Sequence, residues 1–216
     1  MEKPLNEYIE HTNLSPTITA NDVEKLIAEA KEYNFLGICV PPYWVRKARR
    51  DIGNLRLVTV VGFPLGYHRS EVKMKEIESA IYEGANEIDV VINVSAIKTQ
   101  GWEWIKPEIA QFAEYCHKNE VLLKVILETA YLTDQEIVQA CQICSDAGTD
   151  FVKTSTGFAP EGAKVEHIRL IRQSIPSHVG IKASGGIRTK AQALAMIEAG
   201  AERIGTSSGV KIMQMN

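Results

Sequence analysis

A regular alternation of short β-branched runs and amphipathic segments constrains the fold of this chain more than any other feature. Eight runs read as strands, and they cover 8–12, 37–40, 55–61, 87–93, 121–128, 150–154, 180–184 and 203–206. Between most of them apolar residues recur at helical spacing, as in 21–33 and 70–83. Eight strands alternating with helices in 216 residues predict an α/β fold of the (β/α)8 TIM-barrel class, with residues 1–216 forming a single domain.

Helix faces and helix starts support this reading. The segment 21–33 places Val23, Leu26, Ile27 and Ala30 on one face, and the segment 70–83 places Met74, Ile77 and Ile81 together. Thr19, Thr133 and Thr189 each stand three residues before an Asp, Glu or Gln, the spacing of a capping box. A doubly wound open sheet is the rival fold, but neither a G-x-G-x-x-G nor a G-x-x-x-x-G-K-[ST] segment occurs.

Composition and cysteine usage narrow the class of protein. Hydrophobic residues make up 45% and charged residues 24%, which excludes a disordered chain, and a net charge of -3 gives no basic footprint for nucleic acid. No apolar run approaches the roughly 20 residues of a membrane span, and the start lacks a signal-length apolar stretch. Cys141 and Cys144 form a C-x-x-C without a second pair or nearby His, so packing is expected rather than a metal or redox site. We therefore expect a reduced, cytoplasmic protein with no nucleic-acid or membrane partner and no metal.

Charged residues inside the predicted strands are the main chemical signal. Side chains of a strand alternate between two faces, and the helix-facing side of a barrel strand should be apolar. The charged side should then point into the barrel or towards its mouth, in the set Glu10, Asp89, Lys124, Lys153 and Lys182. If they converge, they carry one net positive charge, which the release of one lysine proton would balance. A neutral lysine amine is a nucleophile, and neighbouring cations lower its pKa. The alternative is that each lysine ends a strand and reaches solvent.

Two glycine-containing loops suggest an anion site. Ser184, Gly185 and Gly186 follow the seventh run, and a segment from Gly205 to Gly209 that contains Ser207 and Ser208 follows the eighth. Loops at these places in a barrel commonly bind phosphate, since backbone N–H groups can approach the anion closely. A plain turn is the alternative for the glycines, and Arg188 is either an aid to the anion or a solvated charge.

The same residues resemble a known family. The chain is similar to the deoxyribose-phosphate aldolases from about residue 9 to residue 210. The segments that carry the resemblance are IEHT at 9–12, EIDVV at 87–91, LLKVILET at 122–129, FVKTSTGF at 151–158 and GIKASGGIR at 180–188. Members of this family usually have Asp at the position that Glu10 holds here.

The resemblance implies a (β/α)8 class I aldolase, a lyase of deoxyribose phosphate and nucleotide catabolism. It implies reversible cleavage of 2-deoxy-D-ribose 5-phosphate to acetaldehyde and D-glyceraldehyde 3-phosphate, with no metal or organic cofactor. By position Lys153 would form the Schiff base, Lys182 would lower its pKa, and Asp89 would act in proton transfer with a water. Supporting or substrate-binding roles would fall to Glu10, Thr12 and Lys124, and phosphate or substrate contacts to Thr156, Gly157, Gly185, Gly186, Gly205, Ser207 and Ser208. Barrels of this kind often form homodimers or higher homo-oligomers.

Two other functions remain open from the residues. A phosphate-binding barrel isomerase or synthase without a Schiff base would explain the glycine loops but not the strand lysines. A non-catalytic sugar-phosphate binder would have no need of a neutral amine at Lys153.

Overall fold

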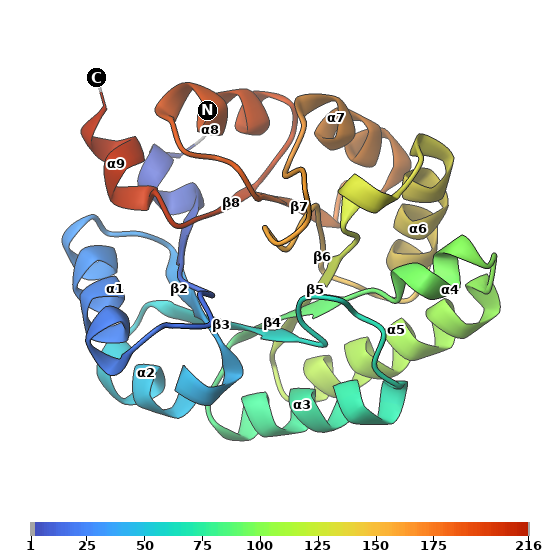
Figure 1. Cartoon of the computed structure of the whole chain (residues 1–216), viewed down its shortest axis with the longest axis horizontal. Coiled ribbons are helices and arrows are strands. Elements are labelled where there is room, and N and C mark those ends of the chain that lie inside the picture. The colour runs from blue at the N-terminus through green and yellow to red at the C-terminus, as the bar shows by residue number, and fades with distance from the viewer. Residues whose placement is uncertain (1–2, 216) are drawn as a thin grey trace.

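Eight parallel strands close into a barrel in sequence order in the computed structural model, which describes residues 3–215 (Figure 1). The strands are β1 (Ile9–Thr12), β2 (Gly37–Val40), β3 (Arg56–Val61), β4 (Glu87–Val91), β5 (Leu122–Ile126), β6 (Phe151–Lys153), β7 (Gly180–Ser184) and β8 (Arg203–Thr206). Because β1 pairs in parallel with both β2 and β8, the sheet has no free edge. The predicted (β/α)8 barrel is confirmed.

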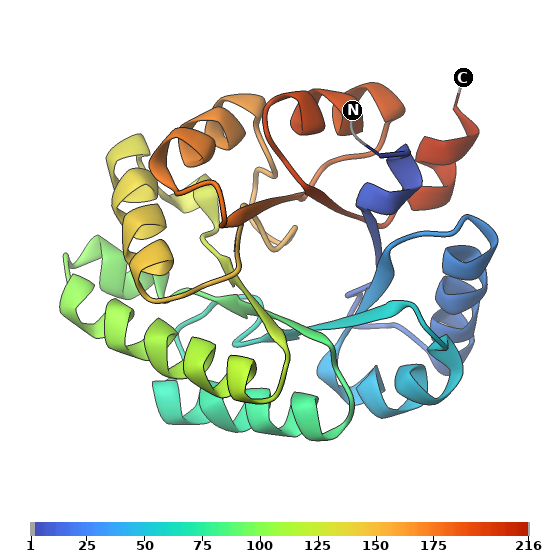
Figure 2. The same ribbon diagram turned by 180° about the vertical axis from the view of Figure 1, so that it is seen from behind.

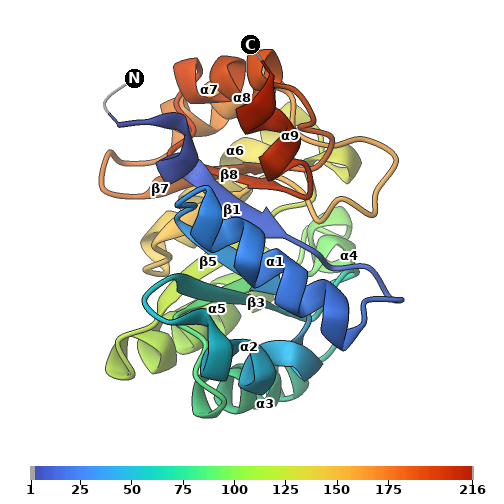
Figure 3. The ribbon, with the colours of Figure 1, turned by 90° about the vertical axis from the view of Figure 1, so that its left-hand side faces the viewer.

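Helices surround the strands as an outer ring (Figures 1 and 2). They are α1 (Ala20–Glu32), α2 (Val45–Ile52), α3 (Ser70–Tyr82), α4 (Val94–Lys98), α5 (Trp102–Lys118), α6 (Asp134–Asp146), α7 (Val165–Ser174), α8 (Lys190–Glu198) and α9 (Gly209–Gln214), with short 3-10 turns at η1 (Leu5–Tyr8), η2 (Pro42–Trp44) and η3 (Thr129–Tyr131). In the side view α1, α2 and α9 lie in front of the strands (Figure 3).

The apolar side of each strand packs against this ring, as the alternation predicts. On β4 the buried Ile88 and Val90 belong to the main core, while Glu87 and Asp89 point the other way. The side chains of Leu123 and Val125 likewise leave Lys124 on the inner side of β5. Burying one large apolar side chain stabilises the folded state by about 1.5–3 kcal/mol. This free energy determines which face of each strand packs against the helices.

The inside of the barrel is divided into an apolar and a charged part. Cys39, Val58 and Val60, on β2 and β3, form a small cluster of their own with Leu14 and Phe63 against it. The buried charged side chains of the strands lie on the inner side of β1 and of β4 to β8, and the candidate site lies in that part; they are Glu10, Glu87, Asp89, Lys124, Lys153, Lys182 and Arg203. The apolar cluster lowers the local dielectric and so strengthens every interaction among the neighbouring charges.

Three helices begin at the threonines that the capping-box spacing predicts. The Thr19 hydroxyl accepts a hydrogen bond from the Asp22 N–H, and the Asp22 carboxylate accepts one from the Thr19 N–H at 2.8 Å. The same reciprocal pair occurs at the starts of α6 and α8. Each box satisfies backbone donors that the first turn of a helix leaves without partners.

The buried face of α3 differs from the prediction. Met74 and Ile81 are only half-buried, and the fully buried positions are Lys73 and Ile77, with Ala80 beside them. Lys73 is tolerated there because its Nζ donates to the Glu108 carboxylate at 3.1 Å and to the Val91 carbonyl at 3.0 Å. Burial lowers the pKa of Lys73, and the Glu108 charge opposes that effect. Helical periodicity alone does not reveal a buried lysine, because its partner lies on α5.

The cysteine pair packs as predicted. Cys141 and Cys144 lie on the buried face of α6, and both thiols are free. Burial raises the pKa of Cys141 to about 12, so the thiol is uncharged and unreactive at neutral pH.

Among the described residues, 3–215, no helix combines the length and the apolar character that a membrane crossing requires.

Candidate active site

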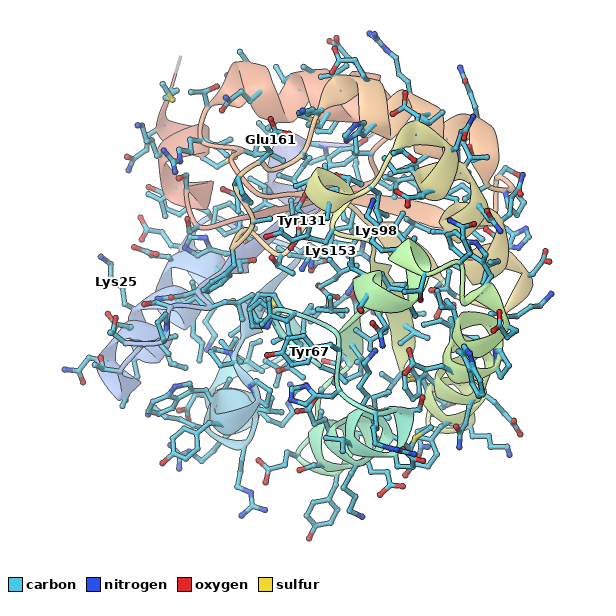
Figure 4. All side chains as sticks on the ribbon, turned by 45° about the vertical axis from the view of Figure 1, so that its right-hand side comes forward. Lys25, Tyr67, Lys98, Tyr131, Lys153 and Glu161 are labelled. Atoms are coloured by element: carbon cyan, nitrogen blue, oxygen red, sulfur yellow. The ribbon has the colours of Figure 1, made fainter. Side chains whose placement is uncertain are left out.

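A cavity of about 300 Å³ opens where the carboxyl ends of β1, β6, β7 and β8 meet. The loop between β6 and α7 curves in over the middle of the ring, and Lys153 lies near the centre of the molecule between Tyr131 and Tyr67 (Figures 1 and 4). The cavity is lined by Thr12, Asn13, Leu14, Ser15, Lys153, Thr156, Gly157, Phe158, Ser184, Gly185, Gly186, Ile187, Arg188, Gly205, Thr206 and Ser207. The carboxyl ends of barrel strands are where the known barrel enzymes hold their active sites.

Lys153 is the one strand lysine that lines this cavity. It is the last residue of β6, so its side chain extends from the strand end towards the mouth. Lys124 and Lys182 lie on neighbouring strands, are fully buried and do not line the cavity. Of the three amines, only that of Lys153 is placed to meet a ligand.

Asp89 joins the three lysines below the cavity floor. Its Oδ2 accepts hydrogen bonds from Lys153 Nζ at 2.9 Å and from Lys182 Nζ at 2.7 Å. Its Oδ1 accepts one from Lys124 Nζ at 2.9 Å. A single carboxylate is therefore shared by three lysines, and Lys153 is the one of them that also lines the cavity.

The electrostatics of the group follow from this sharing. Burial would raise the pKa of Asp89, but the three lysine charges outweigh it and hold that pKa well below its usual range. Burial would lower the pKa of Lys182, but the carboxylates of Asp89 and Glu10 raise it above its usual value. Burial would also lower the pKa of Lys124, but the carboxylates of Asp89, Glu10 and Glu87 raise it above its usual value. Lys182 and Lys124 therefore stay charged at neutral pH.

Glu87 is a member of this group that the sequence reasoning left out. It is fully buried, and its Oε2 lies 2.6 Å from Lys124 Nζ. The five residues named from the sequence do converge, and with Glu87 the three lysines meet three carboxylates. Glu87 also pairs with the buried Arg203 and with Arg56, so the charged group is larger than the set taken from the sequence. The alternation of β4 puts Glu87 on the same face as Asp89 and was the signal that could have identified it.

The structure places Glu10 and Lys124 with the buried charges rather than at the cavity wall. Glu10 forms an ion pair with Lys182, and its second oxygen lies 3.7 Å from Lys124 Nζ. Neither residue lines the cavity, whereas Thr12, two residues beyond Glu10 on β1, does. The family resemblance implied supporting or substrate-binding roles for both residues. Strand alternation could not refine this, because it gives the face of a side chain but not its depth along the barrel.

The loops proposed for an anion converge on the other side of the cavity. Gly185 and Gly186 both have positive φ, at 87° and 76°, which favours glycine and leaves a turn with no side chain in front of its backbone. Gly157, Gly205 and Ser207 line the same space, together with Arg188. Ser208 is different, because it lines a neighbouring cavity of about 480 Å³ that shares Thr12, Asn13 and Ser207 with the first. Backbone N–H groups of such loops are suited to bind phosphate oxygens.

Gly162 packs directly against this turn, and no local sequence pattern predicts the contact. A β-carbon on Gly162 would lie 2.2 Å from the Gly185 carbonyl oxygen. The next residue, Ala163, donates its N–H to the carbonyls of Ser184 and Gly185 at 3.1 and 3.0 Å. The β6–α7 loop and the β7–α8 loop are thus held directly against each other beside the cavity.

Glu128 supports the loop that follows Lys153. It lies beyond the end of β5 with a positive φ of 55°, and its carboxylate accepts hydrogen bonds from the N–H and the hydroxyl of Thr156. Burial raises the pKa of Glu128, and the hydrogen bonds from Thr156 oppose that effect. A non-glycine residue in this conformation is strained, which indicates that the contact with Thr156 determines the local backbone.

The chemistry of the cavity follows from the groups that line it. Within residues 3–215, no three His, Cys, Asp or Glu side chains are arranged to hold a metal ion. The cavity itself presents a primary amine, backbone N–H groups, hydroxyls and a guanidinium. This set can form an imine with a carbonyl compound while holding an anionic group at the far end.

Comparison with known proteins gives a consistent family. Residues 6–215 match the profile described as DeoC/LacD family aldolase. The deoxyribose-phosphate aldolase of Thermococcus kodakarensis is 48% identical over 99% of this chain and 97% of its own length. The deoxyribose-phosphate aldolase of Streptococcus gordonii is 50% identical over 97% of this chain and 96% of its own length.

Solved structures agree with the sequence relatives. An aldolase designated QR15 superposes with a TM-score of 0.92 at 41% identity, covering 96% of this chain and 93% of its own. A structure described as the unique tetrameric structure of deoxyribose phosphate aldolase from Aeropyrum pernix gives a TM-score of 0.90 at 34% identity, covering 97% of this chain and 89% of its own.

Proposed function

The chain belongs to the DeoC/LacD family of aldolases, and from that premise we propose how its own residues carry out the reaction. The activity is that of a deoxyribose-phosphate aldolase, a carbon–carbon lyase that cleaves 2-deoxy-D-ribose 5-phosphate reversibly to acetaldehyde and D-glyceraldehyde 3-phosphate. In our proposal Lys153 forms the Schiff base, Lys182 and Asp89 control its proton, and the glycine loops hold the phosphate.

One observation carries the assignment of Lys153. Of the three lysines bound to Asp89, it alone lines the cavity, and it does so opposite the Gly185–Gly186 turn. A sugar phosphate bridging the two would have its carbonyl carbon at the amine and its phosphate at the turn. Lys182 shares the same Asp89 oxygen with Lys153, so a charged lysine lies beside the proposed nucleophile.

In the proposed reaction the Lys153 amine forms a covalent bond to the substrate and is restored at the end. Neutral Lys153 adds to the C1 carbonyl, and the resulting carbinolamine loses water to give an iminium ion. A base removes the proton of the C3 hydroxyl, the C2–C3 bond breaks, and its electron pair enters the iminium to form an enamine and release glyceraldehyde 3-phosphate. Protonation of the enamine at C2 and hydrolysis by water then release acetaldehyde and restore the amine. Asp89, acting through a water, is our candidate for these proton transfers.

Phosphate recognition can be tested separately from the chemistry. In Gly162→Ala the new methyl group must displace the Gly185 carbonyl, since the two would lie 2.2 Å apart. We expect kcat/KM for 2-deoxyribose 5-phosphate to fall about 10- to 100-fold, because a shift of about 1 Å in a positioning group has effects of this size. Steady-state kinetics with phosphorylated and unphosphorylated 2-deoxyribose measure the difference.

Two comparisons make this result specific. The value for unphosphorylated 2-deoxyribose should change by less than about threefold, because that substrate makes no contact with the turn. Gly101→Ala is a remote control, since its new methyl group would lie 3.2 Å from the Trp104 side chain and outside the cavity. Equal losses for both substrates in Gly162→Ala would remove the assignment of the turn to phosphate.

Trapping of the imine tests the central proposal. Acetaldehyde followed by borohydride should leave a reduced two-carbon adduct on the peptide that contains Lys153, detected by intact and peptide mass spectrometry. Lys153→Ala should show no adduct under the same conditions. A folded wild-type sample that binds the sugar phosphate but gives no adduct would overturn the Schiff-base proposal and favour a barrel isomerase or a sugar-phosphate binder.

The proposal also covers the domain organisation, the location and the oligomeric state of the enzyme. We propose that residues 1–216 act as one domain, which is supported by the pairing of β1 with β8 from opposite ends of the chain. A cytoplasmic location is supported by four buried cysteines with free thiols. A homo-oligomer is supported by the relative from Aeropyrum pernix that is described as tetrameric, and sedimentation of the purified chain would test it.

A further inference from the structure

We infer that Glu87 is a positioning residue for the Schiff-base chemistry: by holding Lys124 at the base of the barrel, it sets the pH at which Lys153 becomes the nucleophile. This inference rests on the proposed function of Lys153. It concerns a buried carboxylate that does not reach the cavity and that the proposed reaction does not use.

The contacts of Glu87 place it between the buried lysines and two arginines. Lys124 Nζ lies 2.6 Å from Glu87 Oε2 and 2.9 Å from Asp89 Oδ1. On its other side Glu87 Oε1 lies 3.2 Å from Arg56 Nη1 and 3.6 Å from Arg203 Nη2. A continuous series of opposite charges therefore runs from Lys153 through Asp89 and Lys124 to Glu87, and ends at the half-exposed Arg56.

The number of carboxylates around each lysine decides which amine loses its proton most easily. Lys124 contacts Glu87 and Asp89 and has Glu10 3.7 Å away, and Lys182 contacts Glu10 and Asp89. Lys153 contacts Asp89 alone among the described carboxylates. Lys153 therefore has the fewest carboxylate partners of the three lysines. Glu87 contributes to this difference, because it gives Lys124 a carboxylate that Lys153 does not contact.

Charged or titratable groups from several strands face the two ends of this series. Glu87 is faced by Lys124 from β5, Arg56 from β3, Arg203 from β8 and Lys182 from β7. Lys153 is near Asp89 from β4, Lys182 from β7, Glu128 beyond β5 and Cys39 from β2. Burial raises the pKa of Cys39 to about 11, so this thiol adds no charge at neutral pH.

Removing the Glu87 charge should change the protonation of Lys153 in one direction. In Glu87→Gln, Lys124 loses one carboxylate while those of Asp89 and Glu10 remain near it, and Arg203 loses the carboxylate beside it. Both effects add positive potential around Lys153 and favour its neutral form. The rising limb of the profile of kcat/KM against pH should move to lower pH by about half to one unit. This is the size expected for the loss of one buried charge that does not contact the titrating group directly.

The experiment compares two buried carboxylates. The pH profile of 2-deoxyribose 5-phosphate cleavage is measured for wild type, Glu87→Gln, Glu87→Asp and Glu108→Gln, with thermal unfolding of each. Glu108 is the matched control, because it also holds a buried lysine, Lys73, at 3.1 Å but lies outside the barrel. We expect both Gln variants to lose stability, only Glu87→Gln to shift the limb, and Glu87→Asp to restore most of the wild-type position.

A second variant covers the case in which Glu87→Gln does not fold. Arg56 is half-exposed, and in Arg56→Gln the Glu87 charge loses a competing cation and acts more strongly on Lys124. The limb should then move to higher pH, opposite to the first variant. The pH dependence of borohydride trapping with acetaldehyde gives the same comparison without turnover.

The outcomes separate this inference from the proposed function. If wild type gives no adduct at Lys153, the proposed function fails and this inference fails with it. If wild type is trapped but the limb is unmoved in a folded Glu87→Gln, or moves equally in Glu108→Gln, the inference about Glu87 alone is overturned.

Discussion

Replacing Lys153 by Met should lower kcat/KM for 2-deoxyribose 5-phosphate cleavage by about 10⁵-fold, the scale of losing a covalent nucleophile. Without the amine no iminium forms, and the C2–C3 bond has no acceptor for its electron pair. The variant should fold, because Asp89 keeps Lys182 at 2.7 Å and Lys124 at 2.9 Å. Steady-state kinetics, with unfolding measured in parallel, give the comparison.

Lys124→Met is the matched control for this prediction. It removes a lysine bound to the same carboxylate from the neighbouring strand, but Lys124 does not line the cavity. We expect the acetaldehyde adduct at Lys153 to form, and activity to fall by no more than about 10²-fold through displacement of Asp89. Comparable losses in the two variants, or more than about 1% activity left in Lys153→Met, would show that the reacting amine has been wrongly identified.

Asp89→Asn should have the second largest effect, on both activity and stability. The change keeps the shape of the side chain but removes the charge that Lys124, Lys153 and Lys182 share. Loss of a proton-transfer group lowers kcat/KM by about 10²–10⁴-fold. Leaving buried ammonium groups without this partner costs about 3–5 kcal/mol in the free energy of unfolding at pH 7.

The stability effect of Asp89→Asn should depend on pH with a defined sign. The lysines hold the pKa of Asp89 well below the value of about 3.9 for an unfolded Asp. Its ionisation therefore stabilises the folded state fully above about pH 4, and this contribution is lost as the pH falls from there towards the folded pKa. The difference in unfolding free energy between wild type and Asp89→Asn should be constant from pH 7 to 5 and narrow below pH 4.

Urea denaturation between pH 7 and pH 3 measures this difference. Asp146→Asn serves as the control, because Asp146 is exposed and pairs with the exposed Lys106 at 3.0 Å. Its effect should stay within about 0.5 kcal/mol at every pH. A difference for Asp89→Asn that does not narrow at low pH would mean that Asp89 is not ionised against the lysines in the folded protein.

Local sequence rules account for the strands, the helix starts and the inner face. The side-chain period of two placed Asp89 and Lys124 inside the barrel, and the capping spacing placed the start of α1 at Thr19. The same rules missed Lys73, because a lysine is buried only where a distant partner such as Glu108 meets it. They also missed Gly162, because its contact with Gly185 joins two loops that no local pattern relates.

The sequence by itself determined that the chain forms a (β/α)8 barrel with charged residues on its inner side, since strand period and helix period are local properties. The tertiary structure decided which charge stands where along the barrel axis. Register places Lys153 beside Lys182 and Asp89 beside Lys124, and it leaves Glu87 one step deeper, beside Leu122. Because strands in a closed barrel are staggered, depth depends on all eight registers together. That stagger is why Lys153 lines the cavity while Lys124 and Lys182 remain buried beneath it.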